Sequence, residues 1–215
     1  NGASKLNEVA TKNGLESNKC AKYISSLIAL GIVKKEKPLT EDESRKSIYL
    51  LNDMMFRFWY RFIPGNMSSI ASGLSDYVYD KAVAPHLSNY MGQIFEQMCI
   101  QYLIRENAAM ALPFIFGRIG RWWGNNPEKK RQEEIDILAV DDENAIFGEC
   151  KWKNEPTGIG VLNELVEKSM LFKQYKYKHY MIFSKSGFTA ELKESAAAME
   201  NVELIDLKKL YEQHT

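Results

Sequence analysis

Apolar and charged positions alternate along two neighbouring segments, residues 133–140 and 146–152, in the way that is typical of β-strands. Residues 141–144 separate them and are all polar, a composition that is typical of a tight turn. The pattern therefore predicts a β-hairpin. The hairpin is unusual because both of its strands carry charged residues in their interior.

The charged residues of this hairpin predict a shared site. Because side chains alternate between the two faces of a strand, Glu149 and Lys151 lie on one face, and strand pairing brings Asp136 close to them. Two carboxylates and an ammonium group on a small sheet are costly unless they hold something. The usual occupant is a hard divalent cation with oxygen ligands. The alternative is an internal salt bridge, in which Lys151 pairs with both carboxylates.

The C-terminal half of the chain alternates between helical and strand periodicity. Helices are predicted at residues 76–89 and 92–106, and a first strand or its approach at residues 114–118. After the hairpin the pattern predicts a helix, a strand, a helix capped by Thr189, a strand and a last helix, at residues 161–172, 180–184, 190–199, 202–206 and 207–213. This order predicts an α/β domain with a central mixed sheet flanked by helices.

Residues 120–126, which include Trp122 and Trp123, have two interpretations. As a loop, this segment would face DNA, with Trp for stacking and Arg for phosphate. As a strand, it would place the two tryptophans on either side of a sheet. We favour the packing interpretation.

The first sixty residues predict two helices and then a second β-hairpin, at residues 6–10, 19–30, 32–36 and 47–51. The apolar stripe of the second helix consists of Ala21, Ile24, Leu27, Ile28 and Leu30. This order is typical of a winged helix-turn-helix, in which the second helix enters a major groove and the wing contacts phosphates. On that interpretation the nucleic-acid-binding residues are Lys19, Lys22, Tyr23, Lys35, Arg45 and Lys46. A winged helix that docks onto protein is the equally weighted alternative.

Residues 52–62 are dense in aromatic side chains. A base-stacking or cofactor-binding segment is one interpretation. We favour a helix that packs between two domains, since aromatic residues dominate core and interface burial. Pro64 and Gly65 then break the chain, and Ser and Gly are frequent up to Ser75. The predicted domains are therefore residues 1–63 and 75–215.

Asp136 followed by Glu149-Cys150-Lys151, on a hairpin that a helix precedes, resembles the PD-(D/E)XK nuclease superfamily. The family's proline before the aspartate is absent, and Ile135 stands there. The resemblance implies a restriction-endonuclease-like fold that hydrolyses phosphodiesters with Mg²⁺ or Mn²⁺. The implied metal ligands are Asp136, Glu149, the backbone carbonyl of Cys150, and Glu96 from the preceding helix. Lys151 would orient or deprotonate a water, or stabilise charge on the phosphate.

The order of winged helix, aromatic segment and nuclease-like domain resembles the C-terminal region of a family of archaeal and bacterial AAA+ ATPases. The aromatic segment is Phe-Arg-Phe-Trp-Tyr-Arg-Phe, at residues 56–62. The resemblance implies an upstream ATPase domain as a partner. No G-x-x-x-x-G-K-[ST] occurs in this sequence, so ATP binding by that motif would lie outside it. Because residue 1 is not Met, we expect the sequence to be part of a longer protein.

Composition narrows the function classes. The 215 residues suffice for one or two domains, and 28 basic residues balance 28 acidic ones, so no global basic surface exists. Residues 1–70 hold 11 of the basic and 7 of the acidic residues, which makes this part net basic and the remainder net acidic. Three cysteines without zinc or disulfide spacing favour a reducing cytoplasm. No apolar run approaches the roughly 18–20 residues that a membrane span needs.

Three function classes remain open. The chain is a metal-dependent nuclease acting on nucleic acid, with DNA as the expected partner, or a catalytically inactive docking or DNA-binding module of an ATPase. The third class is a winged-helix transcription regulator with a sensor domain, which would need a strongly basic recognition helix, and this helix has only Lys19 and Lys22. We favour the nuclease because all the residues of its site are present.

Overall fold

The structure of this chain is a computed structural model that describes residues 4–39 and 46–212. Arg45, one of the predicted DNA-contacting residues, lies outside the described residues. The chain divides into two compact units, residues 1–87 and 88–215. The sequence predicts the boundary between residues 63 and 75, whereas the short helices up to residue 87 group with the first unit.

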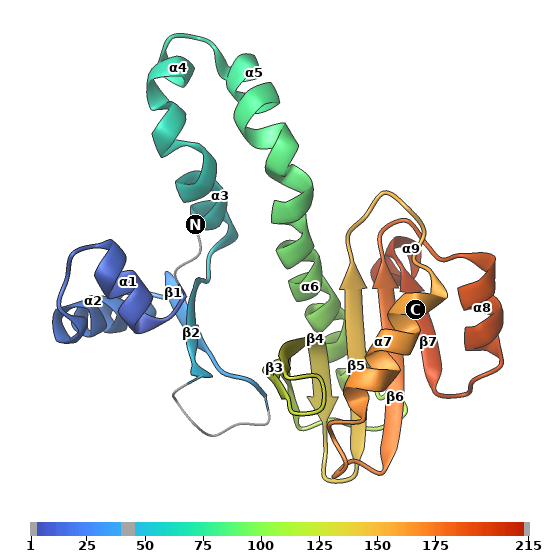
Figure 1. The fold of residues 1–215 in the computed structure, drawn as a ribbon. Helices are drawn as coiled ribbons and strands as arrows, with labels where there is room; N and C mark the ends of the chain where they lie inside the picture. The colour runs from blue at the N-terminus through green and yellow to red at the C-terminus, as the bar shows by residue number, and fades with distance from the viewer. Residues whose placement is uncertain (1–3, 40–45, 213–215) are drawn as a thin grey trace. The chain divides into compact units, whose positions relative to one another are not determined.

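The first unit begins with two helices and a two-stranded antiparallel sheet (Figure 1). These are α1 (Leu6–Lys12), α2 (Ser17–Ala29), β1 (Val33–Glu36) and β2 (Ile48–Leu51). The elements follow the predicted order. Their identification as a winged helix remains a prediction.

The core of these elements is small, and it buries only part of α2. Cys20 and Ile24 are buried against Ala10 of α1, with Val33 of β1 packed beside them. Leu27 and Ile28 are each 36% exposed and Leu30 is 71% exposed. The predicted apolar stripe is therefore wrong for the C-terminal part of α2, because the helix packs on its neighbours through residues nearer its start.

The aromatic segment forms α3 (Met54–Phe62), and Asp53 caps it by accepting a hydrogen bond from the backbone N–H of Phe56 at 2.9 Å. Phe62 is buried, whereas Trp59 and Tyr60 are 46% and 61% exposed. Packing between domains remains a prediction for this helix. The unit continues through η2 (Pro64–Asn66), α4 (Met67–Ala71), α5 (Ser75–Val78) and the π-helical turn η3 (Tyr79–Val83).

One long helix, α6 (Ala84–Ala108), stands where the sequence predicts two. The predicted break falls just before Gly92, which instead lies inside the helix. An interior glycine costs about 1 kcal/mol relative to alanine. The burial of Phe95, Cys99 and Leu103 at 0% exposure offsets this cost, since burying one large apolar side chain contributes about 1.5–3 kcal/mol.

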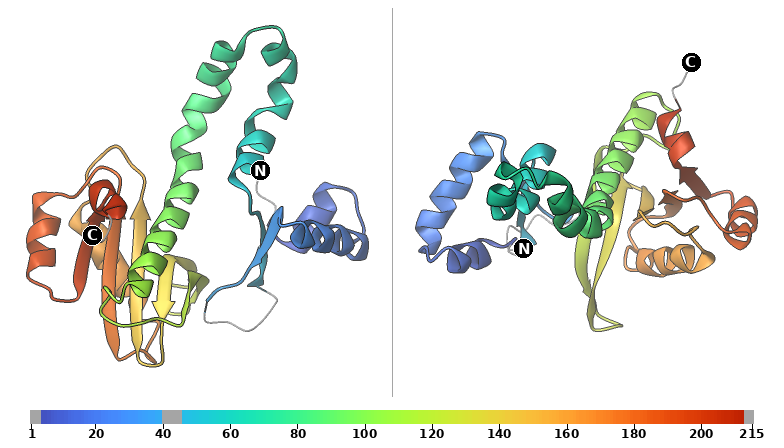
Figure 2. Two further views of the ribbon diagram at one scale, coloured as in Figure 1. Left: turned by 180° about the vertical axis from the view of Figure 1, so that it is seen from behind. Right: turned by 90° about the horizontal axis from the view of Figure 1, so that it is seen from above.

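A mixed sheet organises the second unit and confirms the predicted α/β architecture (Figures 1 and 2). Within the described residues its strand order is β3-β4-β5-β6-β7, with β3, β4 and β5 antiparallel and β5, β6 and β7 parallel. The strands are β3 (Arg118–Asn126), β4 (Arg131–Val140), β5 (Asn144–Lys151), β6 (Tyr177–Ser184) and β7 (Val202–Asp206). The last strand has the predicted bounds.

The first strand of the sheet begins later than the sequence predicts. Residues 114–117 precede β3, and the Asn107 side chain binds the backbone N–H and carbonyl of Phe116 at 3.0 and 3.2 Å. Residues 120–126 are strand, as the packing interpretation expects. Trp122 is 7% exposed, and its ring lies 4.9 Å from that of Phe172.

Helices cover both faces of this sheet, as Figure 2 shows. Buried residues of α6 pack on one face together with Leu210 of α9 (Leu207–Tyr211). On the other face lie α7 (Ile159–Ser169) and α8 (Ala190–Ala197), which connect the parallel strands. Thr189 caps α8 as predicted, accepting a hydrogen bond from the N–H of Leu192 at 3.3 Å. In the described ranges, none of the helices combines the length and the apolar character that crossing a bilayer requires.

Candidate functional site

The pairing between the hairpin strands β4 and β5 ends at the level of Asp136. The β4–β5 register runs from Val140 opposite Ala145 to Ile137 opposite Gly148. At the next position, Oδ2 of Asp136 accepts a hydrogen bond from the backbone N–H of Cys150 at 2.9 Å. The Asp136 carboxylate thus accepts a hydrogen bond from a backbone N–H that lies just beyond the paired part of β4 and β5.

The pairing of β4 with β3, on its other edge, has a bulge at the same level. Gly120 lies opposite Leu138, but Trp122 lies opposite Ile135, so that two residues of β4 match Arg121 alone. An extra residue of this kind bends a strand and redirects a side chain, and bulges are frequent next to active sites. The regular pairing along β4 is therefore interrupted at Asp136 and Ile137.

Glu149 is buried at 8% exposure and is paired with two lysines. Lys151 lies 2.5 Å from its Oε1, and Lys168 of α7 lies 3.3 Å from its Oε2. The lysine side chains are 23% and 17% exposed. The structure thus brings Glu149 and Lys151 together as the sequence predicts, and it adds Lys168.

Glu96 projects from α6 and pairs with an arginine of the sheet. Nε of Arg121 lies 3.5 Å from Oε2 of Glu96, and Nη2 lies 3.7 Å from Oε2 of Glu134. Arg121 is also close enough to lower the pKa of Asp136. Glu96 therefore borders the site through Arg121, and a metal that used Glu96 would have to compete with this ion pair.

Burial and, after it, repulsion from the Glu149 carboxylate raise the pKa of Asp136 from 3.8 to about 6. The Cys150 N–H, Lys151 and Arg121 oppose this rise. A buried carboxylate that a neighbouring carboxylate repels in this way favours a cation beside it. An ion that stabilises both charges would lower the pKa of Asp136.

Lys151 keeps its proton. Burial of the ammonium group favours the neutral form, but the Glu149 carboxylate and its hydrogen bond outweigh burial and raise the pKa of Lys151 above 10.5. In this arrangement Lys151 is a positive charge and a hydrogen-bond donor rather than a base.

The groups that could hold a metal here are two carboxylates and one backbone carbonyl. Within the described residues, no group of three or more His, Cys, Asp or Glu side chains lies close enough to hold a metal. Asp136 and Glu149 supply two carboxylates, and the Cys150 carbonyl lies between Glu149 and Lys151 in sequence. Mg²⁺ is commonly bound through one or two carboxylates and keeps several waters.

Arg121 and Lys168 border this site but are not among the site residues that the sequence predicts. Arg121 lies within the strand that contains Trp122, and Lys168 closes the last turn of α7. Neither forms a motif with Asp136 or Glu149, because both reach the site from other elements. The sequence feature that could have indicated Arg121 is a charged residue inside a strand with two tryptophans.

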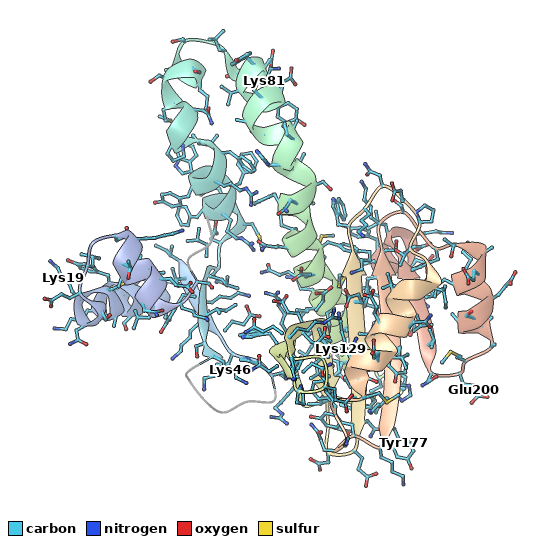
Figure 3. All side chains as sticks on the ribbon, viewed as in Figure 1. Lys19, Lys46, Lys81, Lys129, Tyr177 and Glu200 are labelled. Atoms are coloured by element: carbon cyan, nitrogen blue, oxygen red, sulfur yellow. The ribbon has the colours of Figure 1, made fainter. Side chains whose placement is uncertain are left out.

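The predicted nucleic-acid-binding residues that are described all belong to the first unit. Lys19, Lys22 and Tyr23 are exposed on α2, and Figure 3 labels Lys19 and Lys46. Nζ of Lys35 lies 6.0 Å from the ring centre of Tyr49. Contact of these residues with DNA remains a prediction.

A model of the family DUF234, described as "Archaea bacterial proteins of unknown function", matches residues 59–179, more than half of the chain. The match includes Glu96, Asp136, Glu149 and Lys151. The uncharacterized protein MJECL04 of Methanocaldococcus jannaschii is 33% identical over 190 residues, which cover 86% of this chain and 41% of that protein. The chain thus spans about two fifths of the length of this relative.

Three solved structures show weak similarity. The protein of unknown function AF1548 has a TM-score of 0.37 at 18% identity, covering 55% of this chain and 60% of that one. Protein VC1899 from Vibrio cholerae has a TM-score of 0.38 at 15% identity, covering 93% and 41%. The DNA modification-dependent restriction endonuclease AspBHI has a TM-score of 0.29 at 11% identity, covering 57% and 33%. Similarities at this level assign no function.

Proposed function

Since the chain belongs to the DUF234 family of proteins of unknown function, we propose that its second unit is a metal-dependent nuclease that hydrolyses nucleic-acid phosphodiester bonds. The observation that supports this most is the grouping of Asp136, Glu149 and Lys151 where β4 and β5 part. Their order and types resemble those of PD-(D/E)XK nucleases. The raised pKa of Asp136 adds a physical reason for a cation there.

Asp136, Glu149 and the Cys150 carbonyl would hold Mg²⁺ or Mn²⁺. Glu96 would reach the ion directly or through water after releasing Arg121. When bound, such an ion lowers the pKa of a coordinated water and neutralises charge on the phosphate. The pair Lys151 and Lys168 would turn from Glu149 towards the phosphate, since both ammonium groups already lie at this carboxylate.

Lys151 acts as a charge in this proposal. Its raised pKa keeps it protonated, so it would steer the attacking water and stabilise the negative charge that builds on the phosphate oxygens. It would not remove a proton from the water. This choice narrows the three roles that the sequence leaves open for the residue.

In this proposal the first unit would bind the DNA and so bring it to the nuclease site. Its exposed Lys19, Lys22 and Tyr23 on α2 suit a winged helix that contacts DNA. An ATPase domain would be its partner, and the greater length of MJECL04 is compatible with a further domain. The three cysteines without disulfide spacing favour the cytoplasm as its location. DNA is the substrate that this combination favours.

The test is Mn²⁺ titration by calorimetry, followed by a DNA cleavage assay. The double variant Asp136→Asn/Glu149→Gln should lose both Mn²⁺ binding and cleavage. The charge-matched control Asp142→Asn/Glu200→Gln changes two exposed carboxylates of the same unit and should keep both. Lys151→Gln should lose cleavage but keep the metal. Cleavage by the Asp136→Asn/Glu149→Gln variant would contradict the proposal.

A second candidate is an inactive docking or DNA-binding module. The observation that favours it is that both oxygens of Glu149 are already paired with lysines, as in an internal salt bridge. Absence of Mn²⁺ binding by the well-folded wild-type chain would select this candidate.

A further inference from the structure

Two loops leave the sheet next to the site and are tied together. Residues 152–158 follow β5 and residues 185–189 follow β6, and because these strands are parallel, both loops start from the same edge of the sheet. The backbone N–H of Lys185 donates to the carbonyl of Lys151 at 3.0 Å. The first loop thus begins one residue after Lys151, at Trp152.

Further hydrogen bonds hold the two loops against each other. The N–H of Thr157 donates to the carbonyl of Gly187 at 2.9 Å, and the N–H of Thr189 donates to the carbonyl of Thr157 at 3.0 Å. Ser186 Oγ donates to the carbonyl of Lys153 at 2.6 Å. We call the residues Trp152, Lys153, Asn154, Lys185 and Ser186 the lysine ledge.

The ledge holds the Lys185 ammonium group in place. Nζ of Lys185 donates to Oδ1 of Asn154 at 2.7 Å and lies 5.0 Å from the ring centre of Trp152. The Trp152 ring in turn lies 5.3 Å from that of Phe95, which is fully buried. A lysine supported in this way loses less side-chain freedom when it binds an anion than a lysine in open solvent does.

The charge of the ledge is not compensated by ion pairs. Among the described residues, neither Lys153 nor Lys185 pairs with a carboxylate, and Glu155 is the one acidic residue in these two loops. Other lysines of this unit do have carboxylate partners: Lys129, Lys151, Lys168 and Lys209. Lys129, labelled in Figure 3, pairs with Glu167 at 2.6 Å. The lysines of the ledge therefore differ from these four, and they lie next to the site, where their charge suits an external anion.

We infer that the lysine ledge binds the backbone phosphate of a nucleic-acid strand beside the phosphate that the site would cleave. Lysine is a common phosphate contact in protein–nucleic-acid interfaces, and such contacts fix the register of the strand. The ledge starts directly after Lys151, so a strand on it passes the parted ends of β4 and β5. This inference rests on the proposed function for its substrate, and it makes Lys153 and Lys185 positioning residues.

The test measures DNA binding without catalysis. A fluorescein-labelled DNA duplex is titrated with the full chain in EDTA at several salt concentrations. Lys153→Gln/Lys185→Gln should raise the Kd at least about fivefold and flatten the plot of log K against log salt by about 0.9 for each lost contact. Lys173→Gln/Lys193→Gln, which removes two exposed charges elsewhere in the same unit, should bind like the wild type.

Two further variants guard against a folding artefact. Lys185→Arg keeps the charge and should keep the affinity, and Lys153→Gln alone changes an exposed side chain and should still weaken binding. If the double ledge variant binds DNA as tightly as the Lys173/Lys193 control, the ledge is not a phosphate site.

The outcomes also separate this inference from the nuclease proposal. Wild-type protein that cleaves DNA with Mn²⁺ while the ledge variants bind and cleave normally refutes the ledge and leaves the nuclease. Protein that binds DNA through the ledge yet never cleaves it refutes the nuclease and supports the ledge.

Discussion

The carboxylate of Asp136 accepts a hydrogen bond from the backbone N–H of Cys150, at 2.9 Å, beyond the point where β4 and β5 are paired. This bond places a carboxylate from one strand against the middle residue of Glu149-Cys150-Lys151 on the other. It also satisfies an N–H group that would be costly to leave unpaired in this half-buried position. The same hydrogen bond therefore supports the fold and brings the candidate ligands together.

Replacing Asp136 with Asn should make the protein more stable at neutral and alkaline pH. The folded-state pKa of Asp136 is raised from 3.8 to about 6, so its stabilising contribution is complete below pH 3.8 and is lost as pH rises through about 6. The wild type then loses up to about 3 kcal/mol, a loss that Asn avoids while keeping an acceptor for Cys150. Urea unfolding in EDTA, at about pH 8 and below about pH 4, measures the gap.

The gap in the free energy of unfolding should close at the lower pH. Asp136→Ala should gain less than Asp136→Asn at the higher pH, because it also leaves the Cys150 N–H without its partner. An Asn variant with the same pH dependence as the wild type would show that Asp136 is not the titrating group.

Changes at Glu149 and Lys151 should move the pKa of Asp136 in opposite directions. Glu149→Gln removes a charge that raises this pKa, whereas Lys151→Met removes one that lowers it. The pKa should therefore fall in the first variant and rise in the second. Carbon-detected NMR titration of the Asp136 carboxyl group gives both values, and shifts in one common direction would contradict the arrangement of the three residues.

Removing the Lys168 ammonium group should tighten metal binding. Lys168 lies 3.3 Å from Oε2 of Glu149 and occupies an oxygen that a metal would need. Lys168→Gln should lower the Kd for Mn²⁺ about threefold to tenfold, because one competing positive charge is gone. Calorimetry compares this variant with Lys173→Gln, which changes an exposed lysine that is not paired with Glu149. Weaker binding would mean instead that Lys168 holds Glu149 in position for the metal.

The adjacent tryptophans of β3 should differ in their importance for stability. Trp122 is 7% exposed and packs against Phe172, so Trp122→Ala should cost about 3–5 kcal/mol. Trp123 is only partly buried, and Trp123→Ala should cost clearly less. Denaturant unfolding of both variants measures the difference, and equal losses would contradict the packing of Trp122 in the core.

Much of the second unit could be predicted because its elements follow local rules. The hairpin of β4 and β5 follows from alternating residues around a polar turn, and β7 occurs at the predicted residues. The predicted break before Gly92 was wrong because the burial of α6 outweighs the preference of one glycine. The predicted burial of Leu27, Ile28 and Leu30 was wrong for the opposite reason. The core of the first unit is small, and it leaves these apolar side chains exposed.

The sequence by itself determined the hairpin of β4 and β5, the identity of Asp136, Glu149 and Lys151 on it, and the order that resembles a nuclease. These depend on residue type and on spacing along one hairpin, which are local properties. Only the tertiary structure decided the bulge at Asp136, the pairing of Lys168 with Glu149, and that of Arg121 with Glu96. These depend on how β3, α6 and α7 pack against the sheet, and packing of distant segments is a property that no local pattern records.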